Sequence, residues 1–276
     1  MPELPEVETT RRHLVPHLTG AAIVCTTVSR PRMLRRHEQP SDFGNRLEGS
    51  TITRLDRHGK FLLAWLDNDI VWVTHLGMSG RVEVAAYGAA QQPHTQVIVT
   101  LDSGEDFRLV DPRTFGFVVA YTPEELESSS LGRLGPDALT DLPPSRELGS
   151  RLAGRTAPIK PLLLDQSILA GLGNIYADEA LYRSRLSPFR PGGSLTAPDV
   201  VRLRRAIVTT LDAALRHGGT SLDDLAYLLP DGRSGDFKAR LAVYGREGER
   251  CRRCGHEIDR DVLRQRSTHW CPQCQT

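Results

Sequence analysis

The chain has 276 residues, 39% of them hydrophobic and 25% charged, which is an ordinary composition for a globular protein with two domains. No stretch reaches the roughly 18 apolar residues of a membrane span, and the acidic N-terminus does not resemble a signal peptide, so we expect a cytoplasmic protein with no membrane partner. Because the formal net charge is only +1, any nucleic-acid-binding surface must come from the distribution of charges.

An amphipathic helix is predicted at the N-terminus. Residues 4–20 carry apolar or small side chains at three- and four-residue steps and end in a glycine, a pattern typical of a helix with one buried face. Pro5 suits the first helical turn, and acidic residues there favour the positive end of the helix dipole. The apolar or small positions of this helix are Val7, Thr10, Leu14 and Leu18. Neither the fit of Pro5 to the first turn nor the helix dipole explains why Pro2 and Glu3 precede the helix.

Short β-rich runs fill the region from residue 21 to about residue 121. They are separated by turn signals such as HGK, DND and DSG, which predicts an antiparallel sandwich or a barrel-like sheet. Cys25 lies in the first run and is expected to be a small core residue.

The second half of the chain has loop and helix patterns instead of β-rich runs. A loop-rich stretch with four prolines runs from residue 122 to about residue 158, and helical patterns follow at 162–186 and 198–219. We therefore expect an α+β protein, with a helix and antiparallel β-sandwich at 1–125, a linker at 126–157, a helical domain at 158–235 and a cysteine-rich region at 236–276.

The cysteine-rich region predicts a zinc site. CRRC and CPQC are separated by sixteen residues, and thiolates two positions apart in two such turns complete a tetrahedron around zinc. Four thiolates leave no open coordination position, so one structural Zn²⁺ is expected. The alternatives are a redox dithiol, incidental cysteines, or replacement of one ligand by His256 or His269. The four expected ligands are Cys251, Cys254, Cys271 and Cys274.

Two further features suggest chemistry. Arg266 lies near the tip of the hairpin expected between the cysteine pairs, where it could meet a phosphate or a base edge or could simply be solvated. Only three of the 35 basic residues are lysines, namely Lys60, Lys160 and Lys238. A lysine retained among arginines is a candidate for a task that needs a compact ammonium or a titratable amine, although chance is the alternative.

The opening residues predict a nucleophile. If Met1 is removed in the cell, Pro2 carries a free secondary amine, which can attack a carbonyl carbon and form an iminium directly. An α-amine is less basic than a lysine side chain, so more of it is unprotonated near neutral pH. Glu3 could then move protons, and Glu6 could orient or assist.

Several segments, spread from end to end of the chain, resemble the bacterial formamidopyrimidine-DNA glycosylase family (Fpg/MutM). The resemblance implies a bifunctional DNA glycosylase/AP lyase that excises oxidised purines, such as 8-oxoguanine and formamidopyrimidines, from duplex DNA. It also implies a helix–two-turn–helix, a zinc-ribbon hairpin, and a monomer that binds damaged double-stranded DNA in the bacterial nucleoid. The segments are MPELPEVET, RHGKFLL, HLGMSG, DPRTFG, IKPLLLDQSILAGLGNIYADEAL, VYGREG and the four-cysteine motif.

The resemblance also implies catalytic roles. The N-terminal proline of the family, here Pro2, attacks C1′ of the damaged nucleotide, and β- and δ-elimination follow through an iminium. Glu3 matches the acid/base and Glu6 a supporting carboxylate. Lys60 matches the lysine that contacts phosphate near the lesion and assists catalysis, and Arg266 the zinc-finger arginine that grips the DNA backbone.

A base removed from a duplex must first be extruded, and the gap that it leaves must be filled. By resemblance, Met78 and Phe115 are apolar inserts and Arg113 points toward the orphaned cytosine. Without the resemblance, Met78 and Phe115 would be interpreted as core residues beside strands.

Other DNA contacts are implied with less specific motifs. Asn174 follows two glycines at the start of a helix and matches a phosphate contact. His94 and Lys160 match polar residues near DNA, and Arg233 lies in the region of a basic residue in the lesion-capping loop. Asp236 stands where many relatives have an aromatic residue, so recognition of the damaged base is expected to depart from the common pattern.

Two alternatives remain open at this point. An endonuclease VIII-type glycosylase for oxidised pyrimidines usually begins PEGPE rather than PELPE and lacks the DPR–x–F wedge. A non-catalytic damaged-DNA-binding protein would not need Pro2, Glu3 and Lys60 together.

Overall fold

The computed structural model describes residues 2–222 and 227–276, which form two compact units. The first unit consists of residues 1–133 and 217–238, and the second consists of residues 134–216 and 239–276. The segment 217–238 therefore folds with the N-terminal part of the chain, although about eighty residues of the second unit precede it.

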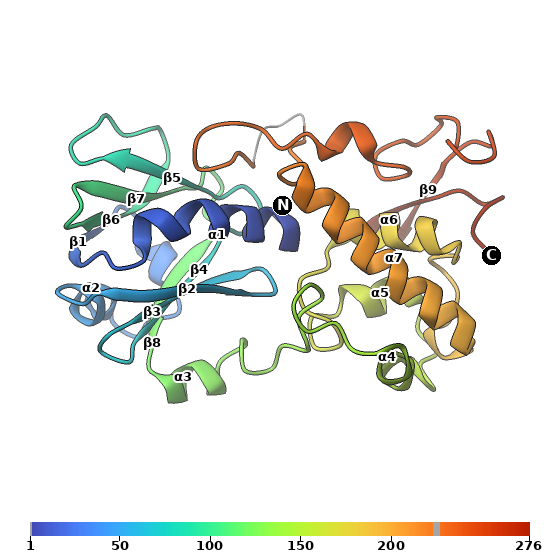
Figure 1. The fold of residues 1–276 in the computed structure, drawn as a ribbon, viewed down its shortest axis with the longest axis horizontal. Helices are drawn as coiled ribbons and strands as arrows, with labels where there is room; N and C mark the ends of the chain where they lie inside the picture. Colours follow the sequence, from blue (N-terminus) through green and yellow to red (C-terminus); the bar gives the residue numbers. More distant parts are fainter. Residues whose placement is uncertain (1, 223–226) are drawn as a thin grey trace. The chain divides into compact units, whose positions relative to one another are not determined.

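The first unit is built on two four-stranded antiparallel sheets (Figure 1), which confirms the expected sandwich. In one sheet the strand order is β2 (Ile52–His58), β3 (Phe61–Leu66), β4 (Val71–His75) and β8 (Phe117–Tyr121). In the other sheet it is β1 (Ile23–Val28), β6 (Thr95–Leu101), β7 (Glu105–Val110) and β5 (Arg81–Ala86). The described helices of residues 2–133 are α1 (Leu4–Leu18), η1 (Pro31–Leu34), α2 (Ser41–Leu47) and α3 (Pro123–Ser128), and the short helix η3 (Phe237–Arg240) begins at the end of the segment 217–238.

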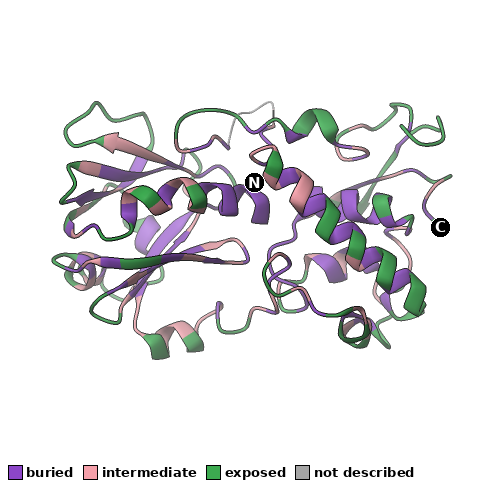
Figure 2. Ribbon diagram, viewed as in Figure 1, coloured by how far each residue is buried: buried purple, intermediate pink, exposed green. Residues whose placement is uncertain are grey.

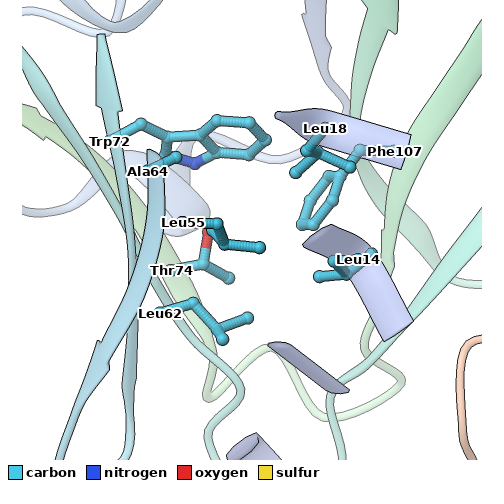
Figure 3. A pocket seen from close by; sticks show the side chains of 8 residues that line it. All are labelled: Leu14, Leu18, Leu55, Leu62, Ala64, Trp72, Thr74 and Phe107. Atoms are coloured by element: carbon cyan, nitrogen blue, oxygen red, sulfur yellow. The ribbon is translucent and has the colours of Figure 1, made fainter. Parts of the chain in front are cut away.

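The core of this unit lies between α1 and the two sheets. The face expected from the sequence of α1 is buried, since Val7, Thr10, Leu14 and Leu18 are at most 1% exposed. Figure 3 shows side chains from α1 and from strands of both sheets converging on one cavity. The cavity has a volume of about 10 Å³ and its lining is almost wholly apolar, so it is a packing defect of water size rather than a substrate site.

One expectation for the first unit is wrong. Cys25 is exposed rather than part of the core. It lies on β1, an edge strand whose pairing with β6 shifts register between Ile23 and Cys25. A bulge of this kind interrupts the alternation of buried and exposed side chains, and Val24 and Cys25 both face outward.

The second unit is helical and ends in a hairpin. Its elements are α4 (Ser145–Leu152), α5 (Ile159–Leu164), α6 (Asn174–Ser184), η2 (Gly192–Ser194), α7 (Ala197–Arg216), β9 (Asp259–Leu263) and β10 (Arg266–Trp270). Helix α6 packs against α5, α7 and β10, and α7 buries one side while its other side is exposed along its length (Figure 2). Within the described ranges, none of the helices combines the length and the apolarity that crossing a membrane requires.

The helical pattern expected at 162–186 is broken into two helices. Helix α5 ends at Leu164 and α6 begins at Asn174, and the residues between them form turns. Gly171 has a φ of +106°, which L side chains rarely adopt, and Gly173 is the extended N-cap of α6. The two helices separated by turns agree with the helix–two-turn–helix that the resemblance implied, and Gly171 permits the backbone conformation of the segment just before α6.

Candidate active site and zinc centre

The first two turns of α1 are buried on every side (Figure 2). Residues 2–10 are all buried, and Glu3, Glu6 and Glu8 are 2%, 1% and 5% exposed. An amphipathic helix buries only one face, so a second cover is needed here. The segment 217–238 provides it, because the backbone N–H of Thr220 donates to Oε1 of Glu6 at 2.8 Å and the Tyr227 hydroxyl donates to the Glu6 carbonyl at 3.4 Å.

The Glu6 carboxylate also holds the residue before the helix. The backbone N–H of Glu3 donates to Oε2 of Glu6 at 2.7 Å, and the two glutamates form a capping box at the start of α1. The peptide bond that joins Pro2 to Glu3 is therefore fixed on the buried end of the helix. Pro2 itself is buried.

A second buried carboxylate connects α1 to the turn that carries Lys60. Oε2 of Glu8 lies 3.2 Å from Nε of Arg57, and the two side chains are 6% and 1% exposed. Arg57 also donates to the carbonyl of Gly59 at 2.9 Å. Gly59 and Lys60 form the two-residue turn between β2 and β3, and Lys60 is half-buried. Burial opposes ionisation of Glu8, but hydrogen bonds from neighbouring arginines hold its pKa below the usual value.

His75 is a functional candidate that the sequence reasoning missed. Its ring packs against the rings of Phe61 and Phe117, with ring centroids 4.8 and 5.4 Å away, and these two rings also contact each other. The backbone N–H of Gly77 donates to Nδ1 at 3.1 Å, which leaves Nε2 to carry the proton of the neutral ring. Burial and then the charge of Lys60 lower the pKa of His75 to about 4. The signal available in the sequence was its place at the start of HLGMSG.

Met78 and Phe115 are exposed, so their interpretation as core residues is wrong. Their side chains are 37% and 40% exposed, whereas most large apolar side chains of this unit are buried. Arg113 is exposed too, and its guanidinium carbon lies 4.9 Å from the centre of the Phe115 ring. The three side chains implied to form a wedge are therefore available at the surface.

Asp111 connects the two loops that carry these side chains. Its carboxylate is completely buried and accepts hydrogen bonds from the Ser79 hydroxyl at 2.7 Å, from the Gly116 N–H at 2.7 Å and from the Arg113 N–H at 3.2 Å. Its own N–H donates to the carbonyl of His94 at 3.0 Å, and His94 is exposed in a turn with a φ of +67°. The sequence reasoning assigned no role to this aspartate, although it begins the DPRTF motif.

The two residues singled out in the lesion-capping loop lie at the surface of the first unit. The side chain of Arg233 is 74% exposed and forms an ion pair with Asp231 at 2.7 Å. The side chain of Asp236 is 77% exposed, and its Oδ1 lies 3.5 Å from Nδ1 of His217. Both side chains can therefore be approached from solvent.

In the second unit, Asn174 and Lys160 converge on one carbonyl oxygen. Nδ2 of Asn174 and Nζ of Lys160 donate to the carbonyl of Ser267 at 2.9 and 2.6 Å, and Lys160 also donates to the Thr268 hydroxyl at 3.0 Å. Lys160 is completely buried and lies 2.7 Å from Oδ1 of Asp178. This burial disagrees with the expectation that Lys160 contacts DNA. Its ammonium instead fixes the hairpin to α5 and α6.

Arg266 is exposed directly beside the hairpin tip. It begins β10 and pairs with Leu263 across the two-residue turn of Arg264 and Gln265. Both turn residues have positive φ, 46° and 62°, as a tight hairpin turn of this kind requires. The next residue in the sequence is Ser267, and its carbonyl accepts hydrogen bonds from Lys160 and Asn174. The backbone beside Arg266 is therefore anchored, while the Arg266 side chain is accessible.

The four cysteines form a metal site. Their Sγ atoms all lie within 4.8 Å of one another, with Cys251 and Cys274 4.0 Å apart and Cys254 and Cys271 3.5 Å apart. A tetrahedral site with zinc–sulfur bonds of about 2.3 Å has sulfur–sulfur edges of about 3.8 Å, so the arrangement fits zinc. Neither His256 nor His269 belongs to the cluster found among the described residues.

Comparisons with known proteins agree with this geometry along the whole chain. Three family models match it in succession: the formamidopyrimidine-DNA glycosylase N-terminal domain at residues 1–118, the H2TH domain of that glycosylase at 134–225, and the zinc finger found in FPG and IleRS at 248–276. The formamidopyrimidine-DNA glycosylase of Geobacillus kaustophilus is 40% identical over 276 residues, which is 100% of both chains. The chain belongs to the formamidopyrimidine-DNA glycosylase family. A Thermus thermophilus member is 42% identical and is covered over 98% of its length.

Solved structures of the family have the same fold. The crystal structure of MutM (Fpg) from Thermus thermophilus has a TM-score of 0.89 at 41% identity, with 99% of this chain and 98% of that chain covered. Lactococcus lactis Fpg in complex with DNA that contains an abasic site has a TM-score of 0.90 at 32% identity, and MutM in complex with DNA that contains carbocyclic 8-oxo-G has a TM-score of 0.89 at 31% identity. In both comparisons the matched region covers 100% of this chain and 100% of the related chain.

Family membership settles the class of enzyme and the metal. The chain is a DNA glycosylase of the formamidopyrimidine type, and its four-cysteine cluster is the zinc finger of that family, suited to one structural zinc ion. The matched models and relatives carry the formamidopyrimidine glycosylase name, which favours this type over the endonuclease VIII type.

Proposed function

We propose that the chain excises oxidised purines from duplex DNA and cleaves the resulting abasic site, with Pro2 as the nucleophile. One observation carries the assignment of Pro2. The peptide N–H that follows it donates to the buried Glu6 carboxylate at 2.7 Å, so the start of the chain, usually its most mobile part, is held in place. A reactive amine gains most from such fixation, because alignment with the target carbon contributes much of the rate.

The proposed reaction begins at the sugar of the damaged nucleotide. The Pro2 nitrogen bonds to C1′ as the bond from C1′ to the base breaks, and the base leaves with the proton that the amine loses. Glu3 then gives a proton to the ring oxygen O4′, the C1′–O4′ bond opens, and the nitrogen lone pair forms the iminium. Removal of a C2′ proton expels the 3′ phosphate, and a second elimination expels the 5′ phosphate. Water finally releases the sugar fragment from Pro2.

Other residues of the first unit are proposed to hold the DNA. Lys60 neutralises a phosphate beside the lesion, and its turn is fixed to α1 through Arg57. Met78 and Phe115 fill the gap left by the extruded nucleotide, and their exposure leaves them accessible for this role. Arg113 reads the orphaned base, and His94 contacts DNA beside it.

In the second unit, Asn174 and Arg266 are proposed to bind phosphates. Asn174 begins α6, where the helix dipole favours an anion, and Arg266 projects from the hairpin that the zinc ion holds together. Lys160 acts as a positioning residue for this hairpin. In this assignment the first unit is the catalytic domain, and the second unit is the DNA-binding domain that ends in the zinc-ribbon finger.

The binding partner is proposed to be damaged double-stranded DNA, bound by a monomer in the nucleoid of the bacterial cytoplasm. Complexes of related proteins with DNA containing an abasic site or carbocyclic 8-oxo-G support this choice of partner. Arg233 lies in the segment proposed to cover the damaged base. Asp236 is exposed in the same segment, so contacts to the base there are expected to be polar rather than aromatic.

A strand-cleavage assay tests the proposal. A duplex with 8-oxoguanine opposite cytosine is incubated with the chain lacking Met1 and with its Pro2→Gly and Glu3→Gln variants. The wild type should cut on both sides of the lesion, Pro2→Gly should lose cleavage, and Glu3→Gln should cut the strand more slowly because ring opening lacks its proton donor. A protein that binds the duplex and leaves it intact would favour the non-catalytic damage-binding alternative.

A further inference from the structure

Two backbone segments cross directly over the buried end of α1. The N–H of Phe237 donates to the carbonyl of Gly219 at 3.2 Å, and the N–H of Ser221 donates to the carbonyl of Gly235 at 3.3 Å. Thr220 and Asp236 form an isolated antiparallel bridge. Residues 219–221 and 235–237 thus make a small two-stranded crossing, and Thr220 presents its N–H from this crossing to Glu6.

Glycine is required at the point of closest approach. Gly219 has a φ of +82°, and a Cβ at this position would lie 2.7 Å from Oε1 and 3.0 Å from Cγ of Glu6. A Cβ at Gly235 would lie 2.4 Å from the Gly219 carbonyl oxygen. Any side chain at 219 would therefore displace either the carboxylate or the crossing, because real Cβ atoms do not approach so closely.

The two oxygens of the Glu6 carboxylate accept hydrogen bonds from different backbone N–H groups. Oε2 accepts from the N–H of Glu3, and Oε1 accepts from the N–H of Thr220. A rigid carboxylate transmits a displacement at one oxygen to the other. The buried side chain of Glu6 therefore connects the peptide between Pro2 and Glu3 to the segment that carries Arg233 and Asp236.

We propose that Gly219 is a positioning residue that acts through Glu6, so that the alignment of the Pro2 amine depends on the packing of residues 218–220 and 235–237. The proposal rests on the proposed nucleophile. It implies that the segment near the damaged base controls the amine itself, in addition to any contact with the base. The cleavage of an abasic site, which offers no base to recognise, should therefore still depend on Gly219.

Gly232 provides a matched control. It lies in the same segment and has a φ of +83°, nearly the same as Gly219, but a Cβ there would have no heavy atom within 4 Å. Gly219→Ala and Gly232→Ala thus introduce similar backbone strain, and only the first disturbs Glu6. Tyr227→Phe is a milder second variant, because it removes the hydroxyl that bonds to the Glu6 and Gly218 carbonyls without adding any atoms.

The test is the rate of borohydride trapping on an abasic-site duplex at saturating DNA, with the dissociation constant measured separately on an uncleavable tetrahydrofuran duplex. Gly219→Ala should lower the trapping rate about tenfold or more across the pH range, as expected for a misaligned nucleophile, with a dissociation constant within about twofold of wild type. Gly232→Ala should match wild type, and Tyr227→Phe should show a smaller loss in the same direction.

The outcomes separate this inference from the proposed function. If wild type traps and Gly219→Ala traps equally fast, the positioning role is wrong while Pro2 remains the nucleophile. Equal losses in Gly219→Ala and Gly232→Ala would also overturn it, since general strain would then explain both. If Gly219→Ala fails to fold, an unchanged rate in Tyr227→Phe overturns it. Failure of the wild type to trap would instead refute the proposed function.

Discussion

The guanidinium of Arg57 lies 3.2 Å from the carboxylate of Glu8, and both side chains are almost wholly buried. Removing one member of a buried ion pair leaves the other charge without compensation and costs about 3–5 kcal/mol. Arg57→Met should destabilise the first unit toward the lower end of that range, because Arg11 and Arg12 still bond to Glu8. It should also slow catalysis by loosening the turn of Lys60. Urea unfolding and single-turnover cleavage measure the two effects.

Arg54 is the matched control for Arg57. It lies on the same strand and forms an ion pair with Asp56, but these side chains are 60% and 42% exposed. Solvent screens such pairs, so Arg54→Met should change the free energy of unfolding by less than about 1 kcal/mol. Equal destabilisation by the two variants would contradict the role given to the buried pair.

Lys160→Met tests the revised role of this lysine. The variant leaves Asp178 buried without its cation and releases the carbonyl of Ser267, so the second unit should lose about 3–5 kcal/mol of stability. Affinity for DNA should fall because Arg266 is less firmly anchored. Lys238→Met, at an exposed position, is the control and should leave stability unchanged. A Lys160→Met protein that is fully stable and only weaker in its salt-dependent binding would restore a direct phosphate contact.

His75 should make the stability of the protein depend on pH. Its folded pKa of about 4 lies below the ordinary histidine value of 6.5, so the unfolded chain binds more protons between these values. The contribution of neutral, buried His75 to the free energy of unfolding is therefore fully present above about pH 6.5 and is lost as the pH falls toward 4. His75→Phe removes this titration, so wild type should lose stability relative to the variant over that window. Parallel stability curves for the two proteins from pH 7 to pH 4 would contradict the assignment.

The zinc finger should couple metal content to DNA affinity. Cys254→Ser removes one of four thiolates, and a structural site of this kind stabilises its domain outright, so the variant should lose zinc and bind DNA more weakly. Atomic absorption and a binding titration measure the two losses. Cys25→Ser, an exposed cysteine outside the cluster, should leave both unchanged. A zinc-free variant that binds DNA as tightly as wild type would show that the metal does not order the hairpin.

Local patterns predicted the elements and the metal site well. The buried face of α1, from Val7 to Leu18, follows from helical spacing alone, and the antiparallel sheets follow from alternating runs between turns. Cysteine spacing identified the four ligands because two residues between thiolates suit a tight turn. These features are determined by residues that are close together in the sequence, so the sequence alone is enough to predict them.

Three of the misses share a physical cause, which is contact between residues far apart in the sequence. Glu6 is buried because Thr220 and Tyr227 return to cover it, and no local pattern indicates this. Lys160 is buried because a hairpin more than a hundred residues later supplies its acceptors. Asp111 joins the loop of Ser79 to the loop of Gly116 through hydrogen bonds that form only when the fold brings the two loops together.

The most direct test of the central claim is to locate the covalent bond to DNA. The chain without Met1 is trapped with borohydride on a duplex with 8-oxoguanine opposite cytosine, digested with trypsin and analysed by mass spectrometry. We predict a single sugar adduct on the peptide of residues 2–11, at the Pro2 nitrogen. An adduct on any of the three lysines, or efficient strand cleavage with no adduct at all, would contradict the account.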